Sequence, residues 1–218
     1  MKHLLLVSFI CFSFFSSCSS TQEIPEASRP ITMITYPPPP QLAPGQAEAI
    51  KAKIAALCPE GEVVRKTEEG FFSPSIDSLV EEGATAMPFL VNEYNRLYGD
   101  PTSDITRRHL LVEVSRRIAS RAHLDFICWV LVRGSQTEKV TAAKSLLEFG
   151  NYGCVGALIA ALDDTDREVV WRSGAALCRI TGNDFGLRPE INDDDFKTAI
   201  YRWKLWYNDC YLKAFPNR

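Results

Sequence analysis

The sequence predicts an all-α fold, a short right-handed α-solenoid of paired helices closed by a Trp-rich terminal helix. Two observations support this. Apolar residues recur at spacings 0, 3, 4 and 7, one face of a helix, in three separate segments. No segment shows the sustained alternation of a β-strand. The three stripes are Met87, Leu90, Val91 and Tyr94; Leu124, Ile127, Cys128 and Leu131; and Val155, Leu158, Ile159 and Leu162.

A second helical segment follows each stripe. These segments are 103–120, 136–149 and 166–181, and they place Val114, Leu146 and Leu177 at steps of 32 and 31 residues. A helical hairpin of this length cannot bury its apolar faces alone, whereas a stack of hairpins forms one continuous core. We therefore expect repeats at about 84–120, 121–150 and 151–182.

Local signals mark the ends of these helices. Ser135 with Glu138, and Thr165 with Glu168, have the spacing of capping boxes. Gly150 and Gly182 stand where a helix commonly ends in a left-handed residue.

The remainder of the predicted domain lies on both sides of the repeats. N-terminal helices are expected within 47–83, one of them starting after Ser73-Pro74, with a loop over 62–72. A terminal helix is expected at 193–211, in a repeat domain of 84–211. It carries a wide apolar stripe, which we expect to cover the open end of the stack.

The N-terminus has the features of an export signal. Lys2 precedes a 12-residue, largely apolar run from Leu4 to Phe15, shorter than the about 17–25 residues of a membrane span. Phe15-Ser16-Ser17-Cys18 resembles the lipobox of bacterial lipoproteins, which implies cleavage after residue 17 and lipidation of Cys18, although Phe15 stands where that family usually has an aliphatic residue. A plain cleaved signal and an uncleaved anchor are the alternatives. The Pro- and Ser-rich segment 18–46 is expected to be a tether.

The repeats resemble a known family. The segment "VGALIAALDDTDREVVWRSGAALCRITG", 155–182, is similar to HEAT repeats of the short bacterial form described in phycobilisome lyases. The tail from Ile180 to Gly186, followed by Trp203 and Trp206, resembles the terminal repeat of exported bacterial HEAT proteins. This resemblance implies a scaffold that binds partners but names no ligand.

Charge and cysteine content limit the function classes. Removal of residues 1–17 takes Lys2 from the 24 basic residues and nothing from the 27 acidic ones, so the net charge changes from −3 to −4. Nucleic-acid binding is not expected from such a balance. Five of the seven cysteines remain beyond Cys18, an odd number without tight metal-ligand pairs. We expect most to be buried, with one disulfide, between Cys154 and Cys178, as an alternative.

Two groups of side chains are candidate partner contacts. The arginines form the one concentrated basic segment: Arg107, Arg108, Arg116, Arg117 and Arg121. They fit either a solvated face with local ion pairs or a contact for an anionic partner. Trp129 and Trp171 lie off the main stripes of their helices and fit a surface contact or packing within the helix.

No complete catalytic, cofactor or metal set is found in the sequence. Asp184-Phe185-Gly186 has the letters of a kinase magnesium loop, but the other kinase motifs are missing and a helix-closing Gly182 precedes it. Phe185 is expected to pack under the last hairpin. Asp163, Asp164 and Asp166 lack the glycine of a calcium loop and favour helix capping.

We therefore expect a non-catalytic interaction module that is exported and tethered to the cell envelope by lipid on Cys18, with unknown envelope proteins as partners. Ser19 after the cysteine resembles outer-membrane sorting. The alternatives are a lyase-like enzyme, which a cleft lined by His109 or His123 would favour, and a purely structural lipoprotein.

Overall fold

A computed structural model describes residues 42–58, 61–67, 70–100, 102–118 and 123–215, all within one compact unit, Met33–Arg218. The signal segment, Cys18 and most of the predicted tether lie outside the described residues. The described chain is mostly helical, which confirms the all-α class. Its elements are α1 (Gln46–Ala55), β1 (Arg65–Lys66), β2 (Phe71–Phe72), α2 (Pro74–Glu81), α3 (Met87–Tyr98), α4 (Ile105–Ile118), α5 (Leu124–Arg133), α6 (Gln136–Phe149), α7 (Val155–Ala160), α8 (Arg167–Thr181), α9 (Asp193–Trp206) and α10 (Leu212–Ala214).

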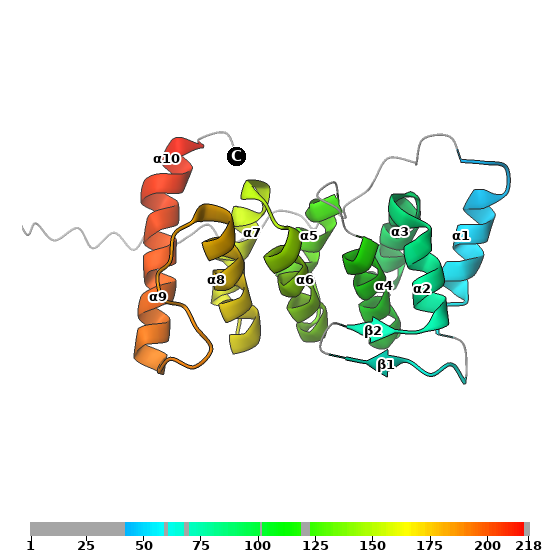
Figure 1. The fold of residues 1–218 in the computed structure, drawn as a ribbon, viewed down its shortest axis with the longest axis horizontal. Helices are drawn as coiled ribbons and strands as arrows, with labels where there is room; N and C mark the ends of the chain where they lie inside the picture. Colours follow the sequence, from blue (N-terminus) through cyan, green and yellow to red (C-terminus); the bar gives the residue numbers. More distant parts are fainter. Residues whose placement is uncertain (1–41, 59–60, 68–69, 101, 119–122, 216–218) are drawn as a thin grey trace, which may run out of the picture. The chain divides into compact units, whose positions relative to one another are not determined.

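The central helices pack in pairs that follow the order of the sequence. α3 packs on α4, α5 on α6 and α7 on α8. Each pair also contacts the next one, through α4 with α6, α5 with α7 and α6 with α8, as can be followed in Figure 1. Short sequence separations between contacting helices mean that each pair depends mainly on its neighbours for burial.

The predicted apolar stripes form the core of this packing. All of their members are buried except Cys128, which is partly buried, and Val114, Leu146 and Leu177 are completely buried. Tyr94 and Phe126 are among the largest completely buried side chains of the described residues, and their rings meet edge to face at 5.2 Å. The periodicity therefore predicted correctly which faces of the helices point inward.

The helix ends agree with the sequence in part. The Ser135–Glu138 capping box is confirmed, and Gly182 ends α8 in the left-handed region with φ 74°. The Thr165–Glu168 box is wrong, because Asp166 is the N-cap of α8 and its carboxylate accepts the Glu168 N–H at 2.7 Å. Gly150 is not left-handed, with φ −53°. A Cβ there would clash with the carbonyl oxygen of Leu146, so close packing explains this glycine.

Glu138 joins three helices as well as capping α6. Its carboxylate is completely buried and accepts hydrogen bonds from the Ser135 N–H at 2.6 Å and from Tyr94 Oη in α3 at 3.2 Å. Arg108 in α4 donates to it at 3.0 Å through Nε. Burial, and then the charge of Glu138, raises the pKa of Tyr94, so the phenol stays protonated as a donor. A buried carboxylate is tolerated only with such partners.

The segment 62–72, expected to be a loop, instead contains a small hairpin. β1 and β2 pair antiparallel, with Arg65 opposite Phe72, and Figure 1 shows them beside α4. Two-residue strands are too short to produce a detectable alternation. Gly70 of the hairpin has φ 143° and lies against the buried Glu113–Arg116 ion pair of α4. In this pair, Arg116 Nη2 is 2.8 Å from Glu113 Oε1.

The last part of the described chain contains α9 and an aromatic cluster. Phe185 meets Trp203 of α9 edge to face at 4.7 Å, so its ring packs against the terminal helix. Asp184 accepts from Arg188 and from the Gly186 N–H, a local arrangement that explains the kinase-like letters. Tyr211 donates to the carbonyl oxygen of Tyr152 at 2.7 Å, so the C-terminal segment is fastened to the turn before α7.

The first prediction concerns Glu138. Glu138→Ala should lower the free energy of unfolding by about 3–5 kcal/mol, because the partly buried Arg108 and the buried Tyr94 would lose their acceptor. Urea unfolding followed by circular dichroism measures the effect. Glu168→Ala is the matched control: Glu168 lies in the first turn of α8 with a side chain 43% exposed, so its loss should cost no more than about 1 kcal/mol. Equal effects of the two substitutions would contradict the assigned role.

The second prediction concerns Gly70. Gly70→Ala would place a Cβ against Glu113 and 2.8 Å from Arg116 Nη2, so the hairpin or the ion pair must shift at a cost of about 2–4 kcal/mol. Gly61→Ala is the control, since Gly61 also has a positive φ (87°) but nothing lies within 4 Å of its Cβ position. Thermal unfolding should show the larger loss for Gly70→Ala, and a smaller loss than in Gly61→Ala would rule out this contact.

Candidate functional site: a groove between α1, α3 and α4

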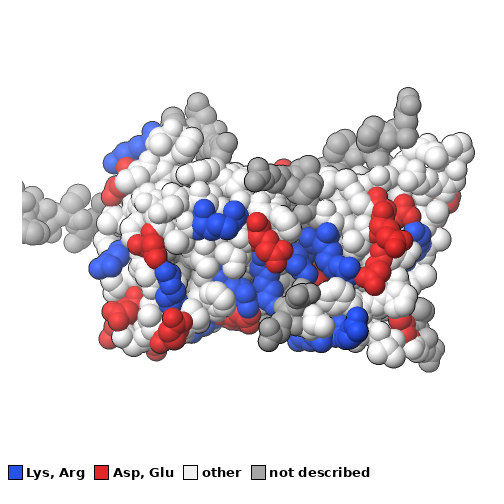
Figure 2. All heavy atoms as spheres, in the orientation of Figure 1, with Lys and Arg blue, Asp and Glu red and all other residues white. Residues whose placement is uncertain are grey.

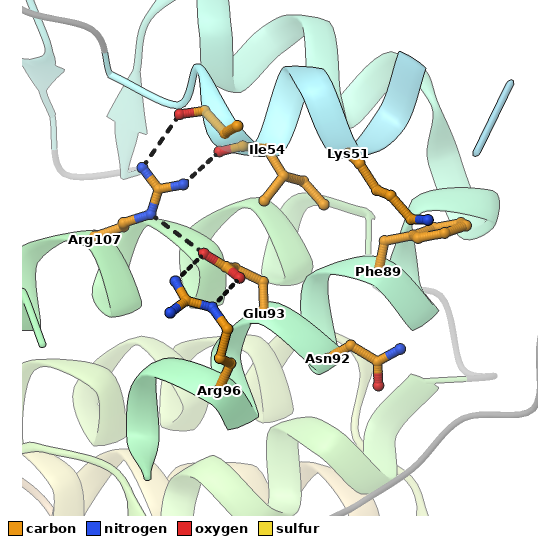
Figure 3. Close-up of a pocket in the computed structure, with 8 residues that line it drawn as sticks. Lys51, Ile54, Phe89, Asn92, Glu93, Arg96 and Arg107 are labelled. Atoms are coloured by element: carbon orange, nitrogen blue, oxygen red, sulfur yellow. Dashed lines mark hydrogen bonds and ion pairs between the residues drawn. The ribbon is translucent and has the colours of Figure 1, made fainter. Parts of the chain in front are cut away.

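The candidate site is a groove of about 460 Å³ formed where α1, α3 and α4 meet. α1 contributes Lys51, Ile54 and Ala55, and α4 contributes Arg107. Four residues of α3 complete the lining: Phe89, Asn92, Glu93 and Arg96. Figure 3 shows that Glu93 lies between Arg96 and Arg107, while Lys51 lies along the ring of Phe89. The groove thus combines charged side chains with an apolar lining, as binding sites commonly do.

Arg107 builds one wall by binding the end of α1. Its guanidinium donates to the carbonyl oxygen of Ile54 at 2.8 Å and lies 3.5 Å from that of Ala55. The last carbonyls of a helix have no partner within the helix and carry partial negative charge, so a cation there is favourable. Arg107 therefore fixes α1 against α4 and shapes the groove.

Glu93 is the one acid in the lining, and two arginines neutralise it. Arg96 donates through Nε and Nη2 at 2.8 and 2.9 Å, a bidentate pair, and Arg107 Nε lies 3.6 Å from Glu93 Oε1. Hydrogen bonds from Arg96 are the main cause that lowers the pKa of Glu93. The carboxylate is therefore ionised at neutral pH.

Lys51 and Asn92 supply polar atoms that the described chain does not use. Both side chains are exposed, and among the described residues neither has a hydrogen bond or an ion pair. The Lys51 ammonium lies 5.9 Å from the centre of the Phe89 ring, within the range of a cation–π contact. Sequence reasoning missed both residues, because their proximity depends on how α1 packs on α3.

The predicted arginine patch is engaged in internal ion pairs. Arg121 lies outside the described residues. On the face drawn in Figure 2, positive and negative side chains are interspersed. This arrangement corresponds to the local-pair alternative. The pairs are Arg107 with Glu93, Arg108 with Glu138, Arg116 with Glu113 (2.8 Å) and Arg117 with Asp77 (2.7 Å).

The two candidate tryptophans are partly buried. Trp129 packs edge to face on Tyr94 at 5.9 Å and on Tyr98 at 4.9 Å, so it belongs to the aromatic layer between α3 and α5. Trp171 lies beneath the Arg172 guanidinium, 4.5 Å from the ring centre. Neither side chain lines the groove.

The cysteines differ from the expected pairing. All five described cysteines are free thiols, so the structure has no disulfide between Cys154 and Cys178. The neighbour of Cys154 is instead Cys128, because α5 packs on the turn before α7. The hydrogen bond between these two thiols, together with burial, raises the pKa of Cys128.

The candidate acids and histidine have structural partners. Asp164 accepts from the Asp166 N–H at 2.8 Å and pairs with Lys139 at 2.7 Å. His109 Nε2 lies 3.0 Å from Thr141 Oγ1, and burial lowers its pKa. Within the described ranges, no group of three or more His, Cys, Asp or Glu residues could hold a metal ion.

Comparisons with known proteins give no further identification. No family model, no curated protein and no solved structure matches the chain. In the part of the chain that the structure describes, no helix combines the length and the apolarity needed to cross a membrane.

The third prediction concerns Arg107 as the residue that shapes the groove. Arg107→Ala should lower the free energy of unfolding by about 1–3 kcal/mol, because the bound carbonyl of Ile54 and the charge of Glu93 lose a partner. Arg202→Ala, an exposed residue of α9 without an ion pair among the described residues, should change it by less than about 0.5 kcal/mol. Urea unfolding of both variants decides the matter. If Arg107→Ala leaves the free energy of unfolding unchanged, α1 is held by other contacts.

Proposed function

We propose that the protein is a non-catalytic interaction module, a HEAT-like α-solenoid held at the bacterial cell envelope by lipid on Cys18. Its partner is an envelope protein, and the binding site is the groove between α1, α3 and α4. The lipid and the Pro-rich segment 18–46 position the module, and the helices present the groove.

The packing of the helices supports the solenoid. Pairs α3/α4, α5/α6 and α7/α8 contact their neighbours in sequence order, which is how solenoid repeats are arranged. The buried stripes at matching positions and the HEAT resemblance of 155–182 point the same way. Solenoids expose extended surfaces along their helices, and a binding role follows from that geometry.

The observation that carries the binding role is the combination, in one groove, of polar side chains without internal partners and an apolar lining. The described arginines of the predicted patch, in contrast, have partners within the chain, such as Arg108 with Glu138 and Arg117 with Asp77. In the groove, Lys51 and Asn92 stand beside an apolar lining without such partners among the described residues. A polar group that no internal bond uses, next to apolar surface, suits recognition of another molecule.

The contacts of His109 favour a structural role for this residue over the enzyme alternative. Thr141 occupies its Nε2, and the ring of Phe71 meets the imidazole edge to face at 5.1 Å. Neither His109 nor His123 lines the groove. These contacts suit a histidine that packs between the hairpin and α6.

The fourth prediction tests the module in cells. A photo-crosslinking amino acid at Asn92 should give a discrete crosslinked product with an envelope protein, whereas the same amino acid at Thr198, on the exposed side of α9, should not. Cys18→Ser should release the chain from the membrane fraction and reduce the product, because the tether no longer concentrates the chain at the envelope. Diffuse or absent products at Asn92, in a membrane-bound and folded chain, would favour the purely structural lipoprotein.

A further inference from the structure

The groove keeps a positive charge after its internal ion pairs are counted. Lys51, Arg96 and Arg107 are cationic and Glu93 is the one acid, so the lining carries a net charge of +2. The whole chain, in contrast, is negative, with a formal net charge of −3. A concave, positively charged site attracts negatively charged ligands even when the chain as a whole is negative.

The three cationic side chains differ in their exposure and in their partners within the chain. Arg107 is bound to the carbonyls of α1 and its side chain is 25% exposed, whereas the side chain of Arg96 is 62% exposed although it pairs with Glu93. Lys51 has no acidic partner among the described residues. An incoming carboxylate can therefore pair with Lys51 without breaking an existing ion pair.

The apolar part of the lining adds a second requirement. Ile54 is buried, Phe89 is half-buried and Ala55 is exposed, and all three face the groove. A volume of about 460 Å³ accommodates a few side chains of a peptide and is at the small end of ligand pockets. The side-chain amide of Asn92 can donate to, or accept from, the main chain of an extended peptide.

We infer that the groove binds an acidic peptide segment of the partner, with a carboxylate on Lys51 and a neighbouring aliphatic side chain against Phe89 and Ile54. This inference rests on the proposed function and specifies its ligand. The charge complementarity selects an acidic segment, and the apolar lining selects one that also carries aliphatic residues.

The hollow form of the site favours a peptide over an anionic membrane surface. Lipid headgroups form a sheet that meets the outermost cations of a protein, whereas the groove places Lys51 beside a concave apolar lining. A side chain from a peptide can enter that space. Binding to vesicles is the competing outcome, and the test includes it.

The fifth prediction uses a fluorescein-labelled hexapeptide of alternating glutamate and leucine, and the full-length chain in non-ionic detergent. Fluorescence anisotropy should show binding that weakens as sodium chloride rises from 50 to 300 mM, because salt screens the charge attraction. The peptide with glutamine in place of glutamate should bind at least about tenfold more weakly. Lys51→Glu should also reduce affinity about tenfold, since it replaces attraction by repulsion.

Lys197→Glu is the matched control, because Lys197 is an exposed lysine of α9 without an acidic partner among the described residues. It should leave affinity unchanged. Lys51→Gln should give an intermediate loss, and thermal unfolding should show that all three variants remain folded. Equal binding of the glutamate and glutamine peptides, or equal effects of Lys51→Glu and Lys197→Glu, overturns the inference. So does Lys51-dependent binding to phosphatidylglycerol vesicles without binding of the acidic peptide.

The outcome can be separated from that of the proposed function. If Lys51→Glu abolishes peptide binding and also the crosslink from Asn92, both proposals are supported. If the crosslink from Asn92 persists in Lys51→Glu and the acidic peptide does not bind the unsubstituted chain, the protein is an interaction module whose ligand is not acidic. Loss of every crosslink in the unsubstituted chain overturns the interaction module itself.

Discussion

The relative position of α3, α4 and α6 depends on one buried carboxylate. Glu138 begins as a local cap of α6, but its remaining lone pairs accept from Tyr94 of α3 and Arg108 of α4. A completely buried charge is costly unless every partner is in place, so the three helices must meet in one relative position. Apolar contacts supply most of the favourable free energy but little directionality. The charged contact supplies the directionality, and the neighbouring pair of α5 and α6 is aligned through it.

The groove also depends on how the charged side chains of α4 are paired. Arg107 and Arg108 are adjacent in sequence, yet one binds the end of α1 and the other binds Glu138. Successive residues of a helix point about 100° apart, so one basic segment serves two different contacts. The arginines therefore organise the helices, while Lys51, which no motif singled out, has no acidic partner among the described residues.

Whether a feature of the fold or of the groove could be predicted depends on how far apart its contacting residues lie in the sequence. Helix periodicity and the Ser135–Glu138 box are local, and both were confirmed. The contact of Glu138 with Tyr94 spans 44 residues, and local patterns carry no information about it. The hairpin at 65–72 was missed because its strands are two residues long. Asp166 replaced Thr165 as the cap of α8 because either residue type can fill that position. The groove was missed because it arises from the packing of α1 on α3.

The position of Glu138 also limits how the chain can be dissected. A fragment that begins at α3 keeps Tyr94, Arg108 and Glu138 together, whereas a fragment that begins at α5 carries the acid without either donor. Deleting the first pair therefore removes more than its own apolar surface, because Glu138 then loses Tyr94 and Arg108, the two side chains through which it fixes the position of α6. Attempts to isolate a minimal version, or to exchange one helical pair for another, should keep α3 to α6 as one indivisible block.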